Sequence, residues 1–492
     1  MDHFELISNH FLNLPRPDVE LGPPAGVVDT TTLAAHDFDV DTRTGFMPPQ
    51  PPLIRLSDQW EAWEQALDDA QVRRLQLGRK PGITEDERNQ SESWRAHIRE
   101  MPIIPTSKLN QSELMLRRAH HVLSWTMHFY IHSLPPSPSS EIIIPAPITV
   151  PLLQISAQLQ LPPVVTYSDD VLYNWAFKSP PLSDPTDSTP LPAPALDNLR
   201  CLTLFTGTRD EEEFYLTSAR MELRGVEALD LMRATMDELF VGDTIALRRI
   251  TQYLHALGRV IDDLAALLMT VRDGCRPDVF YSDIRPWFCG ADSSSEQRRW
   301  IFEGLEDNPD LVAPTELSGP SAAQSSLVHV LDVFLGVDEY SHSNSLTGHH
   351  FVKPSSSSST TATSSLESDK SKISFLTRMQ TYMPRHHRNF LRHLSTAARP
   401  LRETVSDSHD TELLEAYNDA VSSLKRFRDG HIRIVAMYIV GPSRKAADAE
   451  RVESEELQAP LKGTGGTDLV KFLKDVRDRT AAAVMNPKSE CL

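Results

Sequence analysis

The feature that most limits the possible folds is a repeat of apolar residues at helical spacing, with almost no strand-type alternation. The repeat is clearest over residues 243–272 and 413–440, where apolar side chains recur every three or four positions. This spacing gives each segment one apolar face to bury against another helix. Because such segments run along most of the chain, the sequence predicts an all-α protein.

Shorter segments share the same periodicity and extend this prediction. Helices are expected over residues 112–132, 151–159, 168–177, 212–239, 321–335, 371–382, 384–394 and 468–484. Residues 142–150 are apolar but interrupted by prolines, so we expect an extended or connecting segment there.

Length and composition indicate how the chain is divided. With 492 residues, it exceeds one ordinary core, so we expect a smaller N-terminal domain, residues 1–178, and a larger one, residues 201–492. The proline-rich stretch 179–200 is the expected linker. Residues 341–371 contain a serine and threonine run that cannot form a core, so we expect disorder. Residues 441–466 are charged and reach a glycine-rich string, which fits a mobile active-site lid or an ordinary solvated loop.

Charge and cysteine content narrow the range of partners. The formal net charge of −19 argues against nucleic acid and anionic membranes. None of the four cysteines forms a C-x-x-C pair, which favours a reducing compartment. The first residues do not resemble a signal peptide, and no apolar run is long enough to span a membrane. We therefore expect a cytoplasmic protein.

One histidine lies on an apolar helical face, in the string F-R-D-G-H-I-R-I-V. Ile434, Val435 and Tyr438 follow His431 at i+3, i+4 and i+7, so all four share one face. A neutral, buried imidazole is what a haem iron needs as its axial ligand. A hydrogen-bonded core histidine is the alternative. No second histidine lies at i+3 or i+4, so we do not expect zinc here.

Residues 278–290, D-V-F-Y-S-D-I-R-P-W-F-C-G, combine aromatic side chains with an arginine. Pro286 disfavours helix at the preceding residue, so Arg285 is expected at the end of an element. Adjacent aromatics with such an arginine fit a pocket for an aromatic ligand that carries a carboxylate. Core aromatics beside a surface arginine are the alternative interpretation.

Two further patterns are weaker. The string G-T-G-G-T-D, residues 463–468, opens the last expected helix, so its backbone N–H groups could bind an anion. It is neither a P-loop nor a dinucleotide fingerprint, and an ordinary flexible loop is equally compatible. Phe214 and Ser218 lie four residues apart on one helical face, where a lone serine usually bonds its own helix.

Taken together, these segments resemble the indoleamine 2,3-dioxygenase family. The resemblance runs from about Gly45 to about Ala483. It rests on the strings G-F-M-P-P-Q-P-P, L-P-P-V-V-T-Y-S-D-D-V-L-Y-N-W, S-A-A-Q-S-S, Y-M-P-R-H-H-R-N-F-L, F-R-D-G-H-I-R-I-V and G-T-G-G-T-D in this order. It implies a helical protein with a large haem domain. It also implies cleavage of L-tryptophan by O2 to N-formylkynurenine, the first step of the kynurenine pathway of tryptophan catabolism and NAD biosynthesis.

The resemblance also implies roles for individual residues. On the cofactor side it implies His431 as the proximal ligand of haem b iron, Arg428 and Asp332 as its support, and Ser321 and Ala322 over the haem edge. On the substrate side it implies Arg285 as the carboxylate clamp, Phe280 and Tyr281 against the indole, Phe214 and Ser218 in the distal pocket, Tyr167 and Asp170 in the pocket wall, and Thr464 with Gly463 and Gly465 in a closing loop. An electron donor that keeps the iron ferrous and a monomeric state are expected as well.

Two positions depart from the family pattern. Gly319-Pro320 stands where the family often has two glycines, and proline stiffens that turn. Asp170 stands where a small or neutral residue is common, so its carboxylate would clash with an indole or select a different substrate. Two rival functions therefore stay open: a catalytically weak or non-catalytic haem protein that binds O2 or another diatomic gas, and a scaffold without haem.

Overall fold

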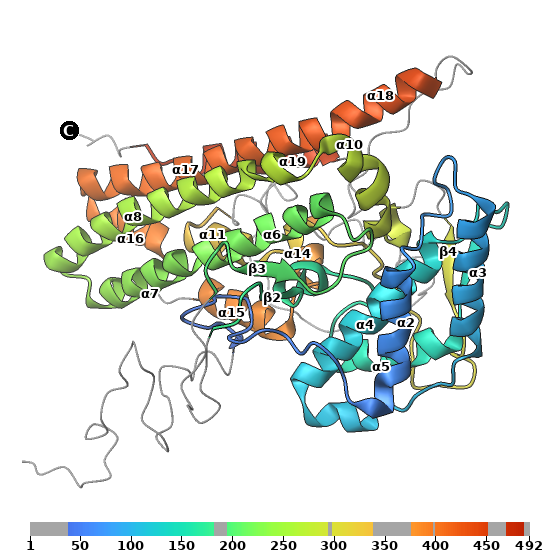
Figure 1. Ribbon diagram of the computed structural model, residues 1–492. Helices are drawn as coiled ribbons and strands as arrows, with labels where there is room; N and C mark the ends of the chain where they lie inside the picture. The colour runs from blue at the N-terminus through green and yellow to red at the C-terminus, as the bar shows by residue number, and fades with distance from the viewer. Residues whose placement is uncertain are drawn as a thin grey trace, which may run out of the picture.

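Helices dominate the structure, a computed structural model, in agreement with the predicted all-α class (Figure 1). It describes residues 38–181, 194–293, 298–337, 375–396, 399–450 and 469–486. The N-terminal stretch, the centre of the expected linker, the serine-rich segment and the glycine-rich string lie outside the described residues. None of the helices in the described ranges has the length and apolarity needed to cross a bilayer.

The N-terminal part is built around one long buried helix, α4. The elements of this part are η3 (Asp58–Trp60), α2 (Glu61–Val72), α3 (Glu85–Glu100), η4 (Ser107–Gln111), α4 (Glu113–His132), α5 (Ala146–Leu159) and the π-helical segment η5 (Ser168–Leu172). Helix α4 packs against α2 and α5. Almost every side chain of α4 beyond its first turn is buried, so this helix forms the core of the N-terminal part.

The C-terminal part contains longer helices that lie side by side (Figure 1). Its helices are α6 (Arg209–Arg224), α7 (Val226–Val241), α8 (Thr244–Met269), α9 (Val271–Gly274), α10 (Pro277–Val279), α11 (Ser326–Phe334), α14 (Phe375–Gln380), α15 (Arg385–Ser395), α16 (Leu401–Ser408), α17 (Thr411–Val435), α18 (Gly441–Glu450) and α19 (Leu469–Ala482). Short 3-10 turns are η7 (Arg285–Phe288), η8 (Ala291–Ser293) and η9 (Ala322–Gln324), and two more π-helical segments are η6 (Phe280–Ile284) and η12 (Ala436–Val440).

Helices α8 and α17 form the most extensive helix pair. The Asp243 carboxylate caps α8 by accepting a hydrogen bond from the Ala246 backbone N–H, and Asp410 caps α17 in the same way. The buried side chains of α8 recur at helical spacing, and those of α17 face them. Helix α17 also packs against α19, so it lies in the centre of this part of the molecule.

Four short strands in the described ranges connect distant parts of the chain. Strand β1 (Glu141–Ile144) pairs in parallel with β4 (Arg299–Phe302) and thereby joins the N-terminal part to the C-terminal part. Strand β2 (Trp175–Phe177) pairs antiparallel with β3 (Leu199–Cys201), on either side of the expected linker. The division into two domains at 179–200 stays a prediction.

Three predicted elements were wrong in part. The segment 168–177 was predicted to be one helix, but it is a π-helical segment followed by β2, whose W-A-F sequence favours a strand. Helix α5 begins before the predicted position 151, inside a segment expected to be extended, because Pro147 fits the first helical turn. The predicted helix 212–239 is divided at Gly225, where a Cβ would lie 2.3 Å from the Leu327 side chain.

The predicted mobile loop 441–466 is also wrong over its first ten residues. Helix α17 continues through η12 into α18, and the three form one long rod along the top of Figure 1. Pro442 lies directly after η12, whose π-helical turn already departs from the regular α-helical hydrogen-bond pattern. Residues 451–466 lie outside the described part of the chain.

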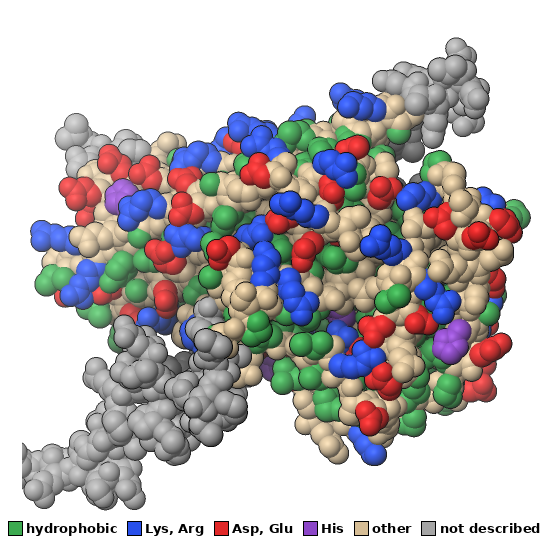
Figure 2. Space-filling view, in the orientation of Figure 1, with side chains coloured by type: hydrophobic (Ala, Val, Ile, Leu, Met, Phe, Trp, Pro, Cys, Tyr) green, Lys and Arg blue, Asp and Glu red, His purple; other side chains and the backbone are tan. Residues whose placement is uncertain are grey.

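The charged side chains do not form a patch of one sign on the face shown in Figure 2. Lysine and arginine side chains alternate there with aspartate and glutamate. Many of them form ion pairs, such as Arg224 with Asp263 and Arg426 with Asp262. On this face the described acidic side chains are thus interspersed with basic ones rather than gathered into one acidic area.

Candidate active site

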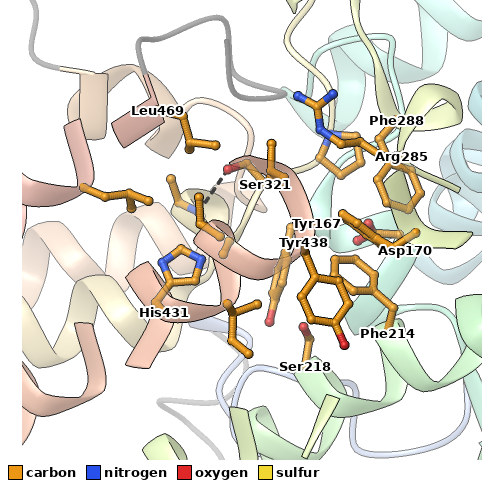
Figure 3. A pocket seen from close by; sticks show the side chains of 18 of the residues that line it. Tyr167, Asp170, Phe214, Ser218, Arg285, Phe288, Ser321, His431, Tyr438 and Leu469 are labelled. Atoms are coloured by element: carbon orange, nitrogen blue, oxygen red, sulfur yellow. Dashed lines mark hydrogen bonds between the residues drawn. The ribbon is translucent and has the colours of Figure 1, made fainter. Parts of the chain in front are cut away.

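A cavity lies where α6, α17, α19 and the three π-helical segments meet (Figure 3). It leaves about 1030 Å³ of unfilled space, part of it open to solvent. Segments η5, η6 and η12 all contribute to its wall, and π-helical turns frequently mark functional sites. The predicted site residues on this wall are Tyr167, Asp170, Phe214, Ser218, Phe280, Arg285, Ser321, Ala322 and His431.

A second cavity of about 1100 Å³ adjoins the first, and the two share His431, Tyr167 and Ser218. Arg428 and Asp332 line only this second cavity. Arg428 and Asp332, which were predicted to support a cofactor, thus line the second cavity, whereas Arg285 and Phe280, which were predicted to hold a substrate, line the first. Their roles stay predictions.

His431 projects from the last turns of α17 toward both cavities. Burial, assisted by the Arg428 cation, lowers the pKa of its imidazole to about 4, so the ring is uncharged at neutral pH. Neither ring nitrogen has a hydrogen-bond partner among the described residues. His329 also lines the second cavity, but its ring bonds the Ala323 carbonyl and the Gln380 amide. Of these two histidines, only His431 offers a free nitrogen to a metal.

Arg428 lies one turn before His431 and ties α17 to its neighbours. Its guanidinium donates to both Asp332 oxygens, at 2.5 Å and 2.6 Å, and also to the Thr480 hydroxyl. Asp332 belongs to α11 and Thr480 to α19, so one buried side chain joins three helices. Because both charges are desolvated and paired in two places, this contact holds the His431 turn of α17 in place.

Aromatic side chains form the wall opposite His431 in Figure 3. The rings of Phe214 and Phe280 lie 4.5 Å apart, and those of Phe214 and Phe288 lie 5.9 Å apart. The Tyr438 ring meets Phe280 edge to face at 5.7 Å. Such a wall provides stacking surface for a flat aromatic ligand, and its apolar character excludes water.

Arg285 enters the cavity at the point where the π-helical segment η6 passes into the 3-10 turn η7. Pro286 suits the start of this turn, which matches the predicted element end. Tyr281 does not line the cavity; its ring lies 5.9 Å from the Arg285 guanidinium carbon instead. Only Phe280 of the predicted aromatic pair therefore faces the cavity, because the wide π-helical turn carries its neighbour to another side.

The segment 317–321 reaches the cavity through an unusually close backbone crossing. A Cβ at Gly319 would lie 1.7 Å from the Phe288 carbonyl oxygen, and one at Gly290 would lie 1.9 Å from the Leu317 carbonyl oxygen. Only glycine fits at either position. The crossing fixes Ser321 beside the Arg285 segment, and the Ser321 hydroxyl accepts a hydrogen bond from Ala323 N–H, drawn as a dashed line in Figure 3.

Tyr167 belongs to a buried network behind the cavity. Its hydroxyl donates to Glu222 Oε1 at 2.9 Å, and the Ser325 hydroxyl donates to the same oxygen at 2.8 Å. The Tyr167 backbone N–H donates to the Gln324 side chain. Burial raises the pKa of Glu222 to about 7. The network connects the N-terminal part of the chain to α6 and α11 at the cavity wall.

Several features of the site were not predicted from the sequence. Phe288 and Val171 line the cavity but were not singled out; Val171 directly follows Asp170, whereas Phe288 meets the predicted Phe214 only in space. Tyr438 was assigned to the buried face of His431, and the i+7 spacing could have placed it in the site. Thr464, Gly463 and Gly465 lie outside the described residues.

The fold is helical, and its cavity combines an uncharged histidine, an arginine and an aromatic wall. Comparison with known proteins gives the particular family. The family model of indoleamine 2,3-dioxygenase matches residues 34–483. This chain belongs to the indoleamine 2,3-dioxygenase family, as the sequence resemblance predicted, and it is an oxidoreductase of the dioxygenase class.

Curated relatives extend over nearly the whole chain. The indoleamine 2,3-dioxygenase of Saccharomyces cerevisiae is 31% identical, over 90% of this chain and 92% of the relative. The indoleamine 2,3-dioxygenase 1 of Mus musculus is 28% identical, over 92% and 96%. The indoleamine 2,3-dioxygenase acdA of Aspergillus candidus is 30% identical, over 93% and 98%.

Proposed function

We propose that the protein binds haem b through His431 and uses O2 to cleave the indole C2–C3 bond of L-tryptophan, giving N-formylkynurenine. Family membership supports the reaction. The observation that carries the residue assignment is that His431 and Arg285 line one cavity with an aromatic wall between them. The product would enter the kynurenine pathway of tryptophan catabolism and NAD biosynthesis.

The residues around His431 fit a haem group. The imidazole is uncharged and lacks a hydrogen-bond partner among the described residues, as an axial ligand requires. The cavities on either side of it share a mainly apolar lining that includes Ile434, Phe472 and Leu473. When bound, the haem would supply an iron that takes up dioxygen beside the substrate. Ser321 and Ala322 would lie at its edge.

The chain's own contribution to the reaction is binding, orientation and exclusion of water. Arg285 has a guanidinium fork that grips the two oxygens of a carboxylate. Phe214 and Phe280 offer the faces on which an indole ring stacks. Holding the amino acid at one end and the ring at the other restricts the substrate to one orientation, with Ser218 beneath it. Thr464, with Gly463 and Gly465, would close the cavity.

The family assignment supports tryptophan and O2 as the substrates. The reaction would also need an electron donor that keeps the iron ferrous, because only ferrous haem binds O2 reversibly. We propose that the protein acts as a monomer in the cytoplasm. These points rest on the sequence resemblance and on composition.

Product analysis with matched variants tests the proposal. Reduced, haem-loaded protein mixed with L-tryptophan and O2 is expected to give N-formylkynurenine, and His431→Ala is expected to lose both the haem absorbance and the product. His255→Ala, which changes an exposed histidine on α8, is the control and should retain both. Full haem occupancy in His431→Ala would show that another residue binds the iron.

A second pair of variants separates substrate binding from haem binding. Arg285→Ala is expected to raise the KM for L-tryptophan by about tenfold or more, because a charge-assisted contact is lost, while the haem spectrum stays intact. Arg433→Ala removes an exposed arginine of α17 and should leave KM unchanged. An unchanged KM in Arg285→Ala would contradict the clamp. Stable O2 binding without product in the wild-type protein would favour a gas-binding function.

A further inference from the structure

Asp170 is a buried acid on the wall of the first cavity, which Arg285 also lines. It lies in the π-helical segment η5, directly after the paired Asp169, and only 4% of its surface is exposed. Its Oδ1 atom has no hydrogen-bond partner in the described part of the chain. In Figure 3 it lies among Tyr167, Phe214 and Phe288, at the aromatic side of the site.

Two other buried acids nearby, Asp169 and Glu211, have hydrogen-bond partners, and a third, Glu222, whose Oε2 is also buried without a partner in the described part of the chain, does not line the cavity. Asp169 accepts hydrogen bonds from His120 and Thr166. Glu211 accepts from the Thr206 and Tyr215 hydroxyls. A buried polar atom without a partner costs about 1–3 kcal/mol. Asp170 is therefore an exception that folding alone does not explain, and its position on a cavity wall indicates that a ligand provides the missing partner.

The state of the carboxyl group indicates what kind of partner fits. Burial raises the pKa of Asp170 well above its ordinary value, and the nearby Asp169 carboxylate raises it further, so the site favours the protonated form of the carboxyl group. A protonated carboxyl has one O–H donor and a carbonyl acceptor. A hydroxyl group, which also donates and accepts, complements both. An unsubstituted indole ring provides only carbon atoms along its six-membered edge and leaves the acid unpaired.

The position of the acid indicates which part of the ligand it meets. The cationic side chain on the same wall, Arg285, is suited to the substrate carboxylate. Phe214 and Phe280 provide the stacking faces. Asp170 lies beside Phe214 in Figure 3, so it is placed to meet the ring of the substrate.

We propose that Asp170 makes this site selective for tryptophans that carry a hydroxyl group on the six-membered ring, by hydrogen-bonding that hydroxyl. The inference rests on the proposed function, because it assumes that this cavity binds a tryptophan-like substrate. It goes beyond the proposed function by naming a class of substrate and the residue that selects it. A site that hydrogen-bonds a substrate hydroxyl discriminates strongly against the analogue that lacks it, because the buried acid is then left unpaired.

The test compares binding and turnover of L-tryptophan, 5-hydroxytryptophan and 6-hydroxytryptophan. Dissociation constants come from calorimetry on the haem-loaded protein, and kcat/KM comes from oxygen consumption. The variants are Asp170→Leu, which keeps the size but removes both hydrogen-bonding atoms, and Asp170→Asn, which keeps a donor and an acceptor. Val171→Ala changes the neighbouring wall residue without touching a polar group and is the matched control.

The wild-type protein is expected to prefer at least one hydroxytryptophan by roughly tenfold in both measurements. Asp170→Leu should lose this preference, while Asp170→Asn and Val171→Ala should retain most of it. Equal ratios in the wild-type protein and Asp170→Leu would overturn the inference, and cleavage of tryptophan in that case would leave the proposed function standing. Selective binding without cleavage would support the inference and contradict the proposed function. Absence of binding by all three compounds would contradict both.

Discussion

At the scale of single residues, Glu222 is a buried acid behind the cavity whose charge state affects the stability of the folded chain. Its Oε1 accepts two hydrogen bonds, from Tyr167 and Ser325, whereas Oε2 is buried without a partner in the described part of the chain. Burial favours the protonated acid and raises the pKa to about 7, above the ordinary value of 4.5. Folding therefore takes up a proton at this site when the pH lies between these two values.

The pH dependence of stability follows from this shift. The Glu222 contribution is complete below about pH 4.5, where the acid is protonated in both states, and it is lost as the pH rises through about 7. The loss amounts to about 3 kcal/mol of unfolding free energy. Glu222→Gln mimics the protonated acid, so its advantage over the wild-type protein should grow between about pH 4.5 and about pH 7 in urea titrations and level off above that range. Parallel pH profiles of the two proteins would contradict this assignment.

Local sequence patterns predicted two polar residues of the cavity wall, His431 and Arg285, better than they predicted the residues around them. His431 and Arg285 were found because a histidine on an apolar helical face and an arginine before a proline are local patterns. The structure places both on one cavity. Glu222 and Phe288 were missed because their importance depends on partners far away in the chain, and no local spacing reports such contacts. Tyr281 was predicted to face the ligand, but a π-helical turn directs it elsewhere.

At the scale of elements, the crossing of the segments around Gly290 and Gly319 positions one side of the site. Each glycine lies against a backbone carbonyl of the other segment, so no flexible side chain can move aside to make room. Ser321 follows two residues after Gly319, and Arg285 precedes Gly290 by one turn and a half. The crossing therefore sets the distance between the segment predicted to lie over the haem and the predicted substrate clamp.

Substitution of Gly319 tests this role. Gly319→Ala is expected to lower the unfolding free energy by about 1–3 kcal/mol or more, because the two backbones must separate. Gly430→Ala is the control: a Cβ there would make only ordinary contacts, the closest at 3.8 Å, and alanine favours the helix. Chemical denaturation of the two variants measures the difference. Equal stability of Gly319→Ala and the wild-type protein would show that the segments move apart easily.

Helix prediction succeeded where one periodic face is buried, as in α4, α8 and α17. It failed where tertiary contacts override the local pattern. At Gly225 the side chain of Leu327 packs against the chain and separates α6 from α7. At β2 the pairing with β3 across a gap in sequence stabilises a strand that periodicity alone assigned to a helix. In α18 a charged segment without an apolar face continues an existing helix, so no nucleation was needed.

At the scale of the whole molecule, the cavity is assembled from segments that are far apart in the chain. Tyr167 comes from the N-terminal part, Phe214 from α6, Arg285 from the turn after η6, and His431 from α17. A ligand that contacts all of these segments binds only the folded chain, so it must stabilise the whole arrangement. The division into two domains stays a prediction, since β1 and β4 join the two parts by parallel pairing.

Haem addition should therefore raise the melting temperature of the haem-free protein. With free haem at about 100 times its dissociation constant, the stabilisation is ~2.7 kcal/mol, which corresponds to a shift of a few degrees. His431→Ala should show a much smaller shift, whereas His255→Ala should match the wild-type protein. Scanning calorimetry at several haem concentrations checks this. A shift of equal size in His431→Ala would place haem binding elsewhere.

The three π-helical segments limit which single-residue deletions the chain can accept without changing its cavity. Each of these turns holds one residue more than an α-helical turn, so deleting a single codon within Ser168–Leu172, Phe280–Ile284 or Ala436–Val440 would let the turn relax into an α-helix. The extra residue is absorbed within the turn, so side chains inside the turn would point in other directions, while the flanking residues would keep nearly the same faces. Transplanting the pocket into a designed helical scaffold would thus require copying three surplus residues, besides the side chains that touch a ligand.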